Sequence, residues 1–434
     1  MTIRIDKPIQ GGTVKAIPSK SEAHRLLICA ALSDRETFIE CPELSEDIEA
    51  TFHCLESLGA IIKHNGSNFH VTPLKIPNNL QPSDHSRVVR PHSTLNLDCG
   101  ESGATLRFLL PLCGALGLSV AFDMRGRLPE RPLGALGEQM TSRGCILSSS
   151  GISPLTCKGQ LKSGTYTLPG NISSQFVSGL LIALPLLSGE SVISLTDALE
   201  SRPYVNMTLD TLRLFGISIY EEDTQTFRIP GGQHFHSPGN VKAGGDWSNA
   251  AFCLSAGAIE NEVTCTGLDI NSKQGDRAIV ELLANFGAHV KYDIDTVTVT
   301  TGVLRGIEID AADIPDLVPA LAVVASTAEG KTIIRNAGRL RIKESDRLHT
   351  VTMLLSALGA DITETEDGLI IIGKKTLTGG VTESFGDHRI VMTAAILSAV
   401  CADPVIIQGA EAVRKSYPGF FDDFRSLGGE FEII

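Results

Sequence analysis

The sequence predicts an α/β protein of two domains, each built from three copies of one repeated unit. Three observations lead to this prediction. A glycine recurs directly after each amphipathic helix. Nearly all-apolar helices alternate with these amphipathic helices, and short strands lie between the two kinds of helix. A repeat of about seventy residues accounts for the 434 residues as six βαβαββ units.

The first element of the repeat is an amphipathic helix followed by Leu or Phe, a glycine and a strand. Copies read "CLESLGAIIKH", "LLANFGAHVKY" and "LLSALGADITE", and "EQMTSRGCILSS" is a looser copy. Glycine directly after a helix typically takes the left-handed conformation that ends the helix. The glycines expected in this role are Gly59, Gly144, Gly216, Gly287, Gly359 and Gly428.

The second element is a helix with apolar residues on every side, as in "SSQFVSGLLIALPLL", which predicts a buried helix. Each copy begins with Ser or Asp, the types preferred at N-caps. If the three buried helices of a domain run parallel, their N-termini share one face and attract anions. The six helices are expected to begin near Ser21, Ser102, Ser173, Asp246, Asp313 and Asp387.

The remaining elements are short strands between the helices, as in "VKYDIDTVTVTTGVLRGIEIDAAD". The last copy begins at Asp387 and stops at Ile434 without its final strands, and the N-terminal "IRIDKPIQGGTVKAIPSKS" aligns with the missing piece. We therefore expect the N-terminal strands to complete the last repeat. Residues 20–242 would form one domain and residues 1–19 plus 243–434 the other, with hinge crossings near 19 and 243.

Composition excludes several classes of protein. With 42% hydrophobic and 20% charged residues, the chain is typical of soluble globular proteins. A formal charge of −13 argues against nucleic-acid binding, because there is no basic excess to neutralise phosphates. No apolar run is long enough to span a membrane, and the first residues lack signal-peptide character. The ten cysteines and the histidines show no metal-ligand spacing, so we expect buried reduced thiols in a cytoplasmic protein without a metal.

Polar clusters at the helix starts each allow two interpretations. "GNISSQF" could be an ordinary capped helix, or Ser173, Ser174 and Gln175 could bind a phosphate. "RLRIKESDRL" could be a solvated salt-bridge face with Glu344 and Arg347 three residues apart, or a cationic anion site. "GDHRIVM" could be a capped helix with a local ion pair.

Asp316 has an unusual setting inside "DIPDLVPALAVV", where apolar residues follow the carboxylate. Partial desolvation raises the pKa of a carboxyl group, so we expect Asp316 to have a raised pKa that suits a general base. The glycine-rich "CGESGATLRFLL" lacks the Gly-Lys-Ser/Thr ending and is not a P-loop.

The chain resembles the 5-enolpyruvylshikimate-3-phosphate synthases nearly from end to end. The motifs that carry the resemblance are, in order, "PSKSEAHR", "SGATLR", "RLPERP", "GNISSQF", "SRPY", "IPD", "RIKESDRL", "GDHR" and "RKSYPGFF". The resemblance implies the enolpyruvyl-transferase fold, an inside-out α/β barrel of two domains with three repeats each around buried parallel helices.

The resemblance also implies the reaction. The enolpyruvyl group of phosphoenolpyruvate passes to the 5-hydroxyl of shikimate 3-phosphate through a tetrahedral intermediate in a closing interdomain cleft, and phosphate is released. This is the sixth of the seven steps of the shikimate pathway towards chorismate and the aromatic amino acids. We expect small anionic substrates, no cofactor, no nucleic-acid or membrane partner, and a monomer.

Individual roles follow from the same resemblance. Asp316 is expected to be the base at the 5-hydroxyl, Glu344 the proton donor to the enol, and Lys20 a contact to both substrates. The residues expected to bind shikimate 3-phosphate are Lys20, Ser21, Arg25, Ser173, Ser174, Gln175, Ser201, Tyr204, Asp316 and Lys343. The residues expected to bind phosphoenolpyruvate are Lys20, Gly103, Arg127, Gln175, Arg347, His388, Arg389 and Lys415.

Three positions depart from the pattern of this family, and two alternative functions stay open. Glu101 replaces a frequent Asn, Ala104 a common Thr and Arg339 an Asn of some members, which bears on local contacts and glyphosate sensitivity. One alternative is a UDP-N-acetylglucosamine enolpyruvyl transferase, although "MRGRLPERP" lacks the reactive cysteine usual there. The other is a non-catalytic anion-binding protein on the same fold, which would not need both carboxylates.

Overall fold

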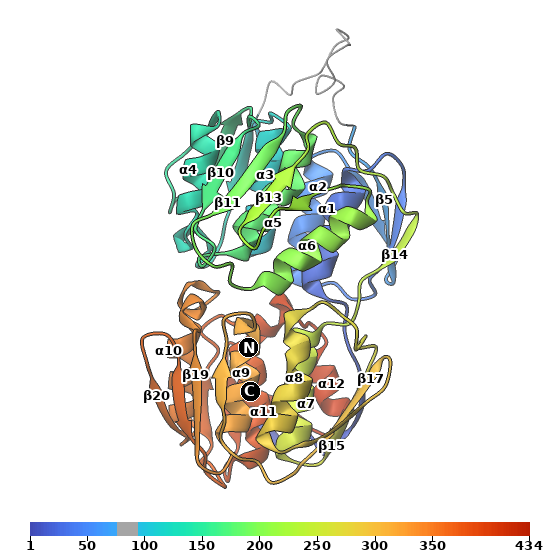
Figure 1. The fold of residues 1–434 in the computed structure, drawn as a ribbon. Coiled ribbons are helices and arrows are strands. Elements are labelled where there is room, and N and C mark those ends of the chain that lie inside the picture. Colours follow the sequence, from blue (N-terminus) through green and yellow to red (C-terminus); the bar gives the residue numbers. More distant parts are fainter. Residues whose placement is uncertain (76–93) are drawn as a thin grey trace. The chain divides into compact units, whose positions relative to one another are not determined.

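The computed structural model describes residues 1–75 and 94–434. The chain forms two compact units, one comprising Met1–Ser19 and Gly244–Ile434 and the other Lys20–Ala243 (Figure 1). It therefore passes between the units twice, after Ser19 and after Ala243. Each unit encloses its own hydrophobic core, and no buried residue is common to both cores.

The unit Lys20–Ala243 alternates helices with short strands. Its helices are α1 (Lys20–Ala31), α2 (Glu46–Ser57), α3 (Gly103–Ala115), α4 (Gly134–Ser142), α5 (Ser174–Ala183) and α6 (Arg202–Leu214), with 3₁₀ turns η2 (Leu128–Glu130) and η3 (Leu184–Leu186). Its strands are β3 (Thr37–Glu40), β4 (Ile61–His64), β5 (Asn68–Thr72), β6 (Leu95–Asp98), β7 (Val120–Asp123), β8 (Cys145–Leu147), β9 (Leu155–Gly159), β10 (Thr165–Leu168), β11 (Ser191–Leu195), β12 (Tyr220–Glu221), β13 (Thr226–Ile229) and β14 (Asn240–Lys242).

The second unit repeats this alternation. Its helices are α7 (Trp247–Ile259), α8 (Ile279–Phe286), α9 (Val318–Ala325), α10 (Arg347–Ala357), α11 (His388–Leu397) and α12 (Phe420–Ser426), with 3₁₀ turns η4 (Gly275–Ala278), η5 (Pro315–Leu317), η6 (Gly338–Ile342), η7 (Ser398–Val400) and η8 (Ala410–Lys415). Its strands are β1 (Thr2–Lys7), β2 (Gly12–Lys15), β15 (Glu262–Thr266), β16 (His289–Tyr292), β17 (Thr296–Thr300), β18 (Glu308–Asp310), β19 (Lys331–Arg335), β20 (Asp361–Glu364), β21 (Leu369–Ile372), β22 (Gly380–Glu383), β23 (Val405–Gln408) and β24 (Glu430–Ile433).

The strands of residues 1–75 and 94–434 form six four-stranded sheets of one topology. In the sheet β10-β11-β13-β12, for example, β10 pairs in parallel with β11, and α5 connects the two strands in sequence. β13 pairs antiparallel with both β11 and β12. The other five sheets repeat this order, so each unit holds three βαβαββ repeats. The predicted fold class is confirmed.

Two sheets take their first strand from a distant part of the chain. β14 pairs in parallel with β3, and β2 pairs in parallel with β15. β1 pairs antiparallel with both β23 and β24. The prediction that the N-terminal strands complete the last repeat is therefore right for β1 and wrong for β2. β2 instead supplies the parallel strand that the fourth repeat needs before α7.

The helices α1, α3, α5, α7, α9 and α11 are buried on nearly every side, as their apolar sequences predict. The close approach of α3 and α5 depends on Gly179, because a Cβ atom there would lie 2.2 Å from the carbonyl oxygen of Arg107. The six glycines that follow the amphipathic helices all have positive φ, from 80° to 109°. Their predicted left-handed conformation is confirmed.

The predicted starts of the buried helices are confirmed to within one residue for five of the six, and four of the five have the predicted Ser or Asp cap. The side chains of Ser102, Ser173, Asp246 and Asp387 each accept a backbone N–H of the first turn. Ser21 lies inside α1, which begins at Lys20. Asp313 does not cap α9, because η5 comes between them and α9 has a proline at its start, where a missing N–H needs no cap.

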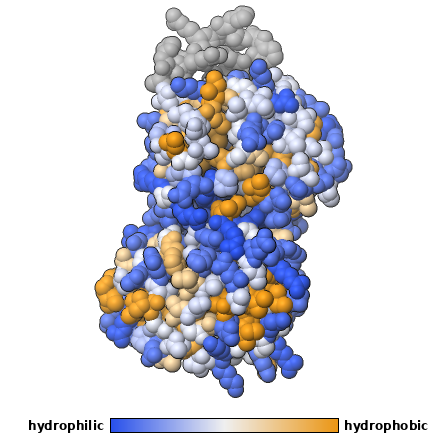
Figure 2. Space-filling view, turned by 90° about the vertical axis from the view of Figure 1, so that its left-hand side faces the viewer, coloured by the Kyte–Doolittle hydropathy of each residue, from blue (hydrophilic) through white to orange (hydrophobic). Residues whose placement is uncertain are grey.

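Hydrophobic residues on the face shown in Figure 2 form separate groups among hydrophilic ones. Several exposed apolar side chains belong to the edge strands β4, β8 and β16, among them Ile61, Ile146 and Tyr292. All ten cysteines are free thiols, nine of them buried and Cys401 partly so, as predicted. Among the described residues, no helix combines the length and apolar character that a membrane crossing requires.

Candidate active site

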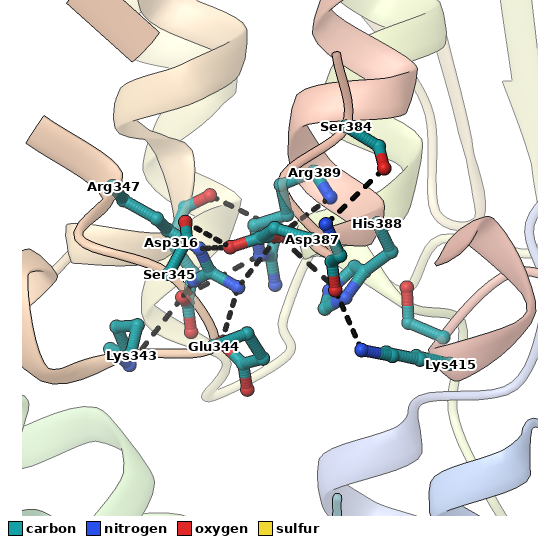
Figure 3. A network of polar contacts seen from close by, with 12 residues as sticks. Asp316, Lys343, Glu344, Ser345, Arg347, Ser384, Asp387, His388, Arg389 and Lys415 are labelled. Carbon is teal, nitrogen blue, oxygen red and sulfur yellow. Dashed lines mark hydrogen bonds and ion pairs between the residues drawn. The ribbon is translucent and has the colours of Figure 1, made fainter. Parts of the chain in front are cut away.

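The polar site in the unit that contains Gly244–Ile434 centres on Arg347, the buried first residue of α10. Its guanidinium donates from Nη1 to Asp316 Oδ1 at 2.7 Å and from Nη2 to Glu344 Oε2 at 2.6 Å. A third bond runs from Nε to Asp387 Oδ2 at 2.7 Å (Figure 3). Three carboxylates from η5, the segment before α10 and the N-cap of α11 therefore converge on one cation.

Asp316 is surrounded by further cations. Lys343 Nζ lies 3.5 Å and Arg389 Nε 3.6 Å from Asp316 Oδ1, and Arg389 Nη1 donates to the backbone oxygen of Asp316 at 3.0 Å. Burial raises the pKa of Asp316, but Lys343, Arg389 and Arg347 outweigh this and hold the pKa well below its usual range. The predicted raised pKa is wrong here, because the desolvated carboxylate is packed among three positive charges.

The two basic residues that reach Asp316 from "RIKESDRL" differ in their protonation. Burial lowers the pKa of Lys343 to about 8, although Asp316 opposes this shift. Burial also lowers the pKa of Arg347, but Asp387, Glu344 and Asp316 reverse the effect and leave it above its usual value. Arg347 is thus a permanent cation, whereas Lys343 changes its charge in mildly alkaline solution.

The other residues predicted to bind substrate in this unit, His388, Arg389 and Lys415, lie in or contact the N-terminal end of α11. Asp387 caps the helix by accepting the backbone N–H of Arg389 at 2.9 Å. His388 is buried, with Nδ1 3.8 Å from Asp387 Oδ1. Lys415 Nζ donates to the carbonyl oxygen of Gly386 at 2.6 Å. The sequence predicted Asp387 only as a cap, and its contact with Arg347 joins the "GDHR" and "RIKESDRL" motifs.

The two interpretations of "RLRIKESDRL", a solvated salt-bridge face and a cationic anion site, each apply to a different arginine of this segment. Arg341 donates to Glu364 at 2.6 Å and to Asp346 at 3.1 Å with a side chain that is 30% exposed, which fits a surface salt-bridge cluster. The pair of Glu344 and Arg347 has the predicted spacing, but the arginine side chain is only 2% exposed. The solvated interpretation is therefore wrong for Arg347.

The polar site of the unit Lys20–Ala243 lies at the first two turns of its helices. Arg25 donates from Nε to Thr208 Oγ1 at 2.7 Å and from Nη2 to the backbone oxygen of Tyr204 at 2.9 Å. Its Nη1 donates to the backbone oxygen of Ser21 at 2.6 Å. These acceptors are neutral. Burial lowers the pKa of Arg25 to about 10, so it stays charged at neutral pH.

Hydrogen bonds connect the first two turns of five helices, α1, α2, α3, α5 and α6. The links are Lys20–Asp47 at 2.7 Å, Thr51–Thr105 at 2.6 Å, Arg107–Gln175 at 2.9 Å, Ser178–Thr208 at 2.8 Å and Arg25–Thr208 at 2.7 Å. The predicted residues Lys20, Arg25 and Gln175 thus each make one of the bonds that link these helices.

The N-termini of α5 and α3 hold three further predicted residues. Ser173 caps α5 by accepting the N–H of Gln175 at 3.3 Å, and Ser174 is its buried first residue. Gly103 begins α3, and a Cβ there would lie 2.7 Å from Arg107 Nη1 and 2.8 Å from Arg131 Nη1.

Arg107 and Arg131 are the buried cations that the sequence analysis missed. A signal for Arg107 was present, because it lies within the apolar run "TLRFLL" just as Asp316 precedes one.

The rest of the predicted set is more peripheral. Arg127 lies outside the helix network, with a 43% exposed side chain 3.8 Å from Glu130. Ser201, the N-cap of α6, is buried and has a left-handed φ of 52°. Of the departures, Glu101 packs against Gly126, where a Cβ would lie 2.3 Å from Oε2. Arg339 donates to the backbone oxygen of Ala312 at 3.3 Å.

Neither polar site resembles a metal centre. In the part of the chain that the structure describes, no three His, Cys, Asp or Glu side chains are arranged to hold a metal ion. Both sites instead concentrate cations and N–H donors at helix starts, which is the chemistry that binds phosphate and carboxylate groups. The first site adds two carboxylates, Asp316 and Glu344, that contact the buried guanidinium of Arg347.

Comparison with known proteins gives a family and a fold. Residues 3–424 match the family described as EPSP synthase (3-phosphoshikimate 1-carboxyvinyltransferase). A protein of Clostridium kluyveri named 3-phosphoshikimate 1-carboxyvinyltransferase is 46% identical over 422 residues, covering 97% of this chain and 96% of its own. One of the same name from Clostridium acetobutylicum is 43% identical over 430 residues, covering 99% and 97%.

Solved structures agree with these matches. An EPSP synthase from Acinetobacter baumannii has a TM-score of 0.80 and 26% identity, with 100% of both chains covered. The enolpyruvyl transferase NikO from Streptomyces tendae, at 19% identity, has a TM-score of 0.77 over 99% of this chain and 98% of its own, and supports the fold alone.

Proposed function

This chain belongs to the EPSP synthase (3-phosphoshikimate 1-carboxyvinyltransferase) family, and from that premise we propose which of its residues bind and react. The enzyme transfers the enolpyruvyl group of phosphoenolpyruvate to the 5-hydroxyl of shikimate 3-phosphate and releases phosphate, a step of aromatic amino acid biosynthesis. The other two functions considered are not favoured, because relatives at 43–46% identity bear this name.

The observation that carries the proposed roles is the convergence of Asp316 and Glu344 on buried Arg347. The reaction removes a proton from the 5-hydroxyl and adds one to the enol carbon, so it needs one base and one acid. We assign Asp316 as the base, Glu344 as the acid, and Lys20 as a contact to both substrates.

The low pKa of Asp316 fits this role if the substrates share its cations. An anion that binds Arg389 and Arg347 offsets the positive potential that these two guanidinium groups exert on Asp316. The remaining effect of burial then raises the pKa of Asp316 towards that of a useful base. In this proposal, the carboxylate becomes basic only when phosphoenolpyruvate is present.

Phosphoenolpyruvate carries a carboxylate and a phosphate, and the arginine fork binds both bidentately. We propose that Arg347, His388, Arg389 and Lys415 bind it from around α10 and α11, which the contacts of Asp387 and Gly386 hold in place. Further contacts are proposed from Lys20, Gly103, Arg127 and Gln175.

Shikimate 3-phosphate is assigned to the network of helix starts. Arg25 offers a buried charge whose acceptors are neutral oxygens, and Ser173 and Ser174 lie at the N-terminus of α5, where a phosphate is favoured. The other proposed contacts are Lys20, Ser21, Gln175, Ser201, Tyr204, Asp316 and Lys343.

We also propose a cytoplasmic monomer. The ten free thiols support a reducing compartment, because disulfides form and persist in oxidising compartments. Sedimentation of the purified protein tests the assembly state, and a stable dimer would contradict it.

Phosphate release on mixing the two substrates tests the assigned roles. Asp316→Ala and Glu344→Gln should each lower kcat by roughly 10²- to 10⁴-fold. Glu344→Gln should retain shikimate 3-phosphate binding, whereas Asp316→Ala also loses one of the proposed contacts to that substrate. Exposed Asp361→Ala and Glu366→Gln are matched controls that should keep the wild-type rate. Variants of Asp316 and Glu344 that bind both substrates and turn over normally would refute the assignment.

A further inference from the structure

Arg107 is a buried cation to which the proposed function gives no role. It lies in the second turn of α3, is 3% exposed, and its guanidinium carbon lies 5.6 Å from the centre of the Phe176 ring of α5. Its Nη2 donates to the backbone oxygen of Pro132, just before α4, at 3.4 Å. Its backbone is also closely packed, because a Cβ atom at Gly179 of α5 would lie 2.2 Å from the carbonyl oxygen of Arg107. Three segments of one unit therefore set the position of this guanidinium.

The hydrogen bond from Arg107 to Gln175 fixes how the amide of Gln175 is turned. Arg107 Nη1 donates to Gln175 Oε1 at 2.9 Å. A guanidinium group carries donors only, so the amide atom that it contacts must be the carbonyl oxygen. The amide nitrogen, with its two N–H donors, then lies on the other side of the planar group. Gln175 is in the first turn of α5, where Ser173 caps the helix by accepting its backbone N–H. The held amide thus adds side-chain donors to a helix start.

We infer that Arg107 is a positioning residue that holds Gln175 with its N–H donors, rather than its oxygen, towards an anionic substrate. Phosphate and carboxylate oxygens accept hydrogen bonds and repel a carbonyl oxygen, so only one of the two amide orientations binds them. A glutamine that is not held populates both orientations and loses side-chain entropy when a ligand selects one. Arg107 removes this loss from the binding step, because the orientation is set when the chain folds. The inference rests on the proposed contact between Gln175 and phosphoenolpyruvate.

The test is a double-mutant cycle of Arg107→Met and Gln175→Ala. Methionine keeps apolar volume against Phe176 and removes the donors. The KM for phosphoenolpyruvate, measured by phosphate release at saturating shikimate 3-phosphate, should rise roughly three- to tenfold in Arg107→Met, with kcat within about twofold of wild type. In the Gln175→Ala background the same substitution should change KM by less than about twofold, because no amide remains to be held. Equal rises in both backgrounds would show a merely structural role and overturn the inference.

Gln175→Glu gives a second arm that keeps the buried arginine and its hydrogen bond. Glutamate has the shape of glutamine and can accept the bond from Arg107, but it offers no N–H donor. The KM for phosphoenolpyruvate should therefore rise by at least roughly tenfold. A wild-type KM in this variant would show that the amide donors are not used, and the inference would be wrong.

Arg143→Met is the matched control for the loss of an arginine. Arg143 also lies over an aromatic ring, 5.8 Å from the centre of Tyr166, and donates to the backbone oxygen of Thr165 at 2.7 Å. This variant should keep the wild-type KM for phosphoenolpyruvate. Wild-type enzyme that releases no phosphate would contradict the proposed function, whereas active enzyme with equal KM rises in both backgrounds of the cycle contradicts only the role of Arg107.

Discussion

Arg347 illustrates how one residue organises a site. Its fork satisfies Asp316, Glu344 and Asp387 in different directions at 2.6–2.7 Å, which a single ammonium group cannot reproduce. Arg347→Lys should therefore leave buried carboxylates without a partner and destabilise the protein by about 3–5 kcal/mol in urea unfolding. The control Arg341→Lys changes a partly exposed arginine and should cost less than about 1 kcal/mol. Equal losses of unfolding free energy in the two variants would contradict the proposal that Arg347 holds the three carboxylates together.

Lys343 supplies a prediction on pH. Because burial lowers its pKa to about 8, the free enzyme loses this positive charge as the pH rises through that value. If Lys343 attracts shikimate 3-phosphate, kcat/KM for that substrate should fall above a pH of about 8. Lys343→Arg keeps the charge and should abolish the fall over the same range. The measurement is the pH profile of phosphate release, and identical profiles for the two enzymes would remove Lys343 from binding.

At this scale, sequence reasoning found residue identities better than it found their electrostatics. The motif "RIKESDRL" pointed to Glu344 and Arg347, which do contact each other. The pKa of Asp316 was predicted in the wrong direction, because the cations that lower it lie 27 or more positions away in sequence.

The recurring glycine sets where each amphipathic helix ends, and it gives a prediction at the scale of the element. Gly287 has φ of +109°, and a Cβ there would lie 2.3 Å from the carbonyl oxygen of Val303. Gly287→Ala should cost at least about 1–2 kcal/mol in urea unfolding. Gly134, at the start of α4, has open space and no positive φ, so Gly134→Ala should be neutral or slightly stabilising. Similar losses in both variants would show that the conformation of Gly287 is not needed.

Helices were easier to predict than the pairing of strands. The positions of the buried helices follow from apolar runs and N-caps, and only α9 begins away from its predicted start, at Val318 after the turn η5. The pairing of β2 with β15 joins segments about 250 residues apart, and a strand of four residues carries no sequence signal for its partner. Repeat counting alone therefore placed both N-terminal strands in the last repeat.

At the scale of the whole molecule, the two crossings make Lys20–Ala243 one continuous segment with a core of its own. Its first sheet is complete only when β14 pairs with β3, although these strands lie at opposite ends of the segment. A fragment of residues 20–243 should therefore fold and unfold cooperatively in urea, as followed by circular dichroism. A matched fragment that ends at residue 238 lacks β14 and should be less stable by about 1–3 kcal/mol, because β3 then loses its parallel partner. If the longer fragment stays unfolded, or if both fragments unfold at the same urea concentration, the segment is not the independent unit that its sheets and core indicate.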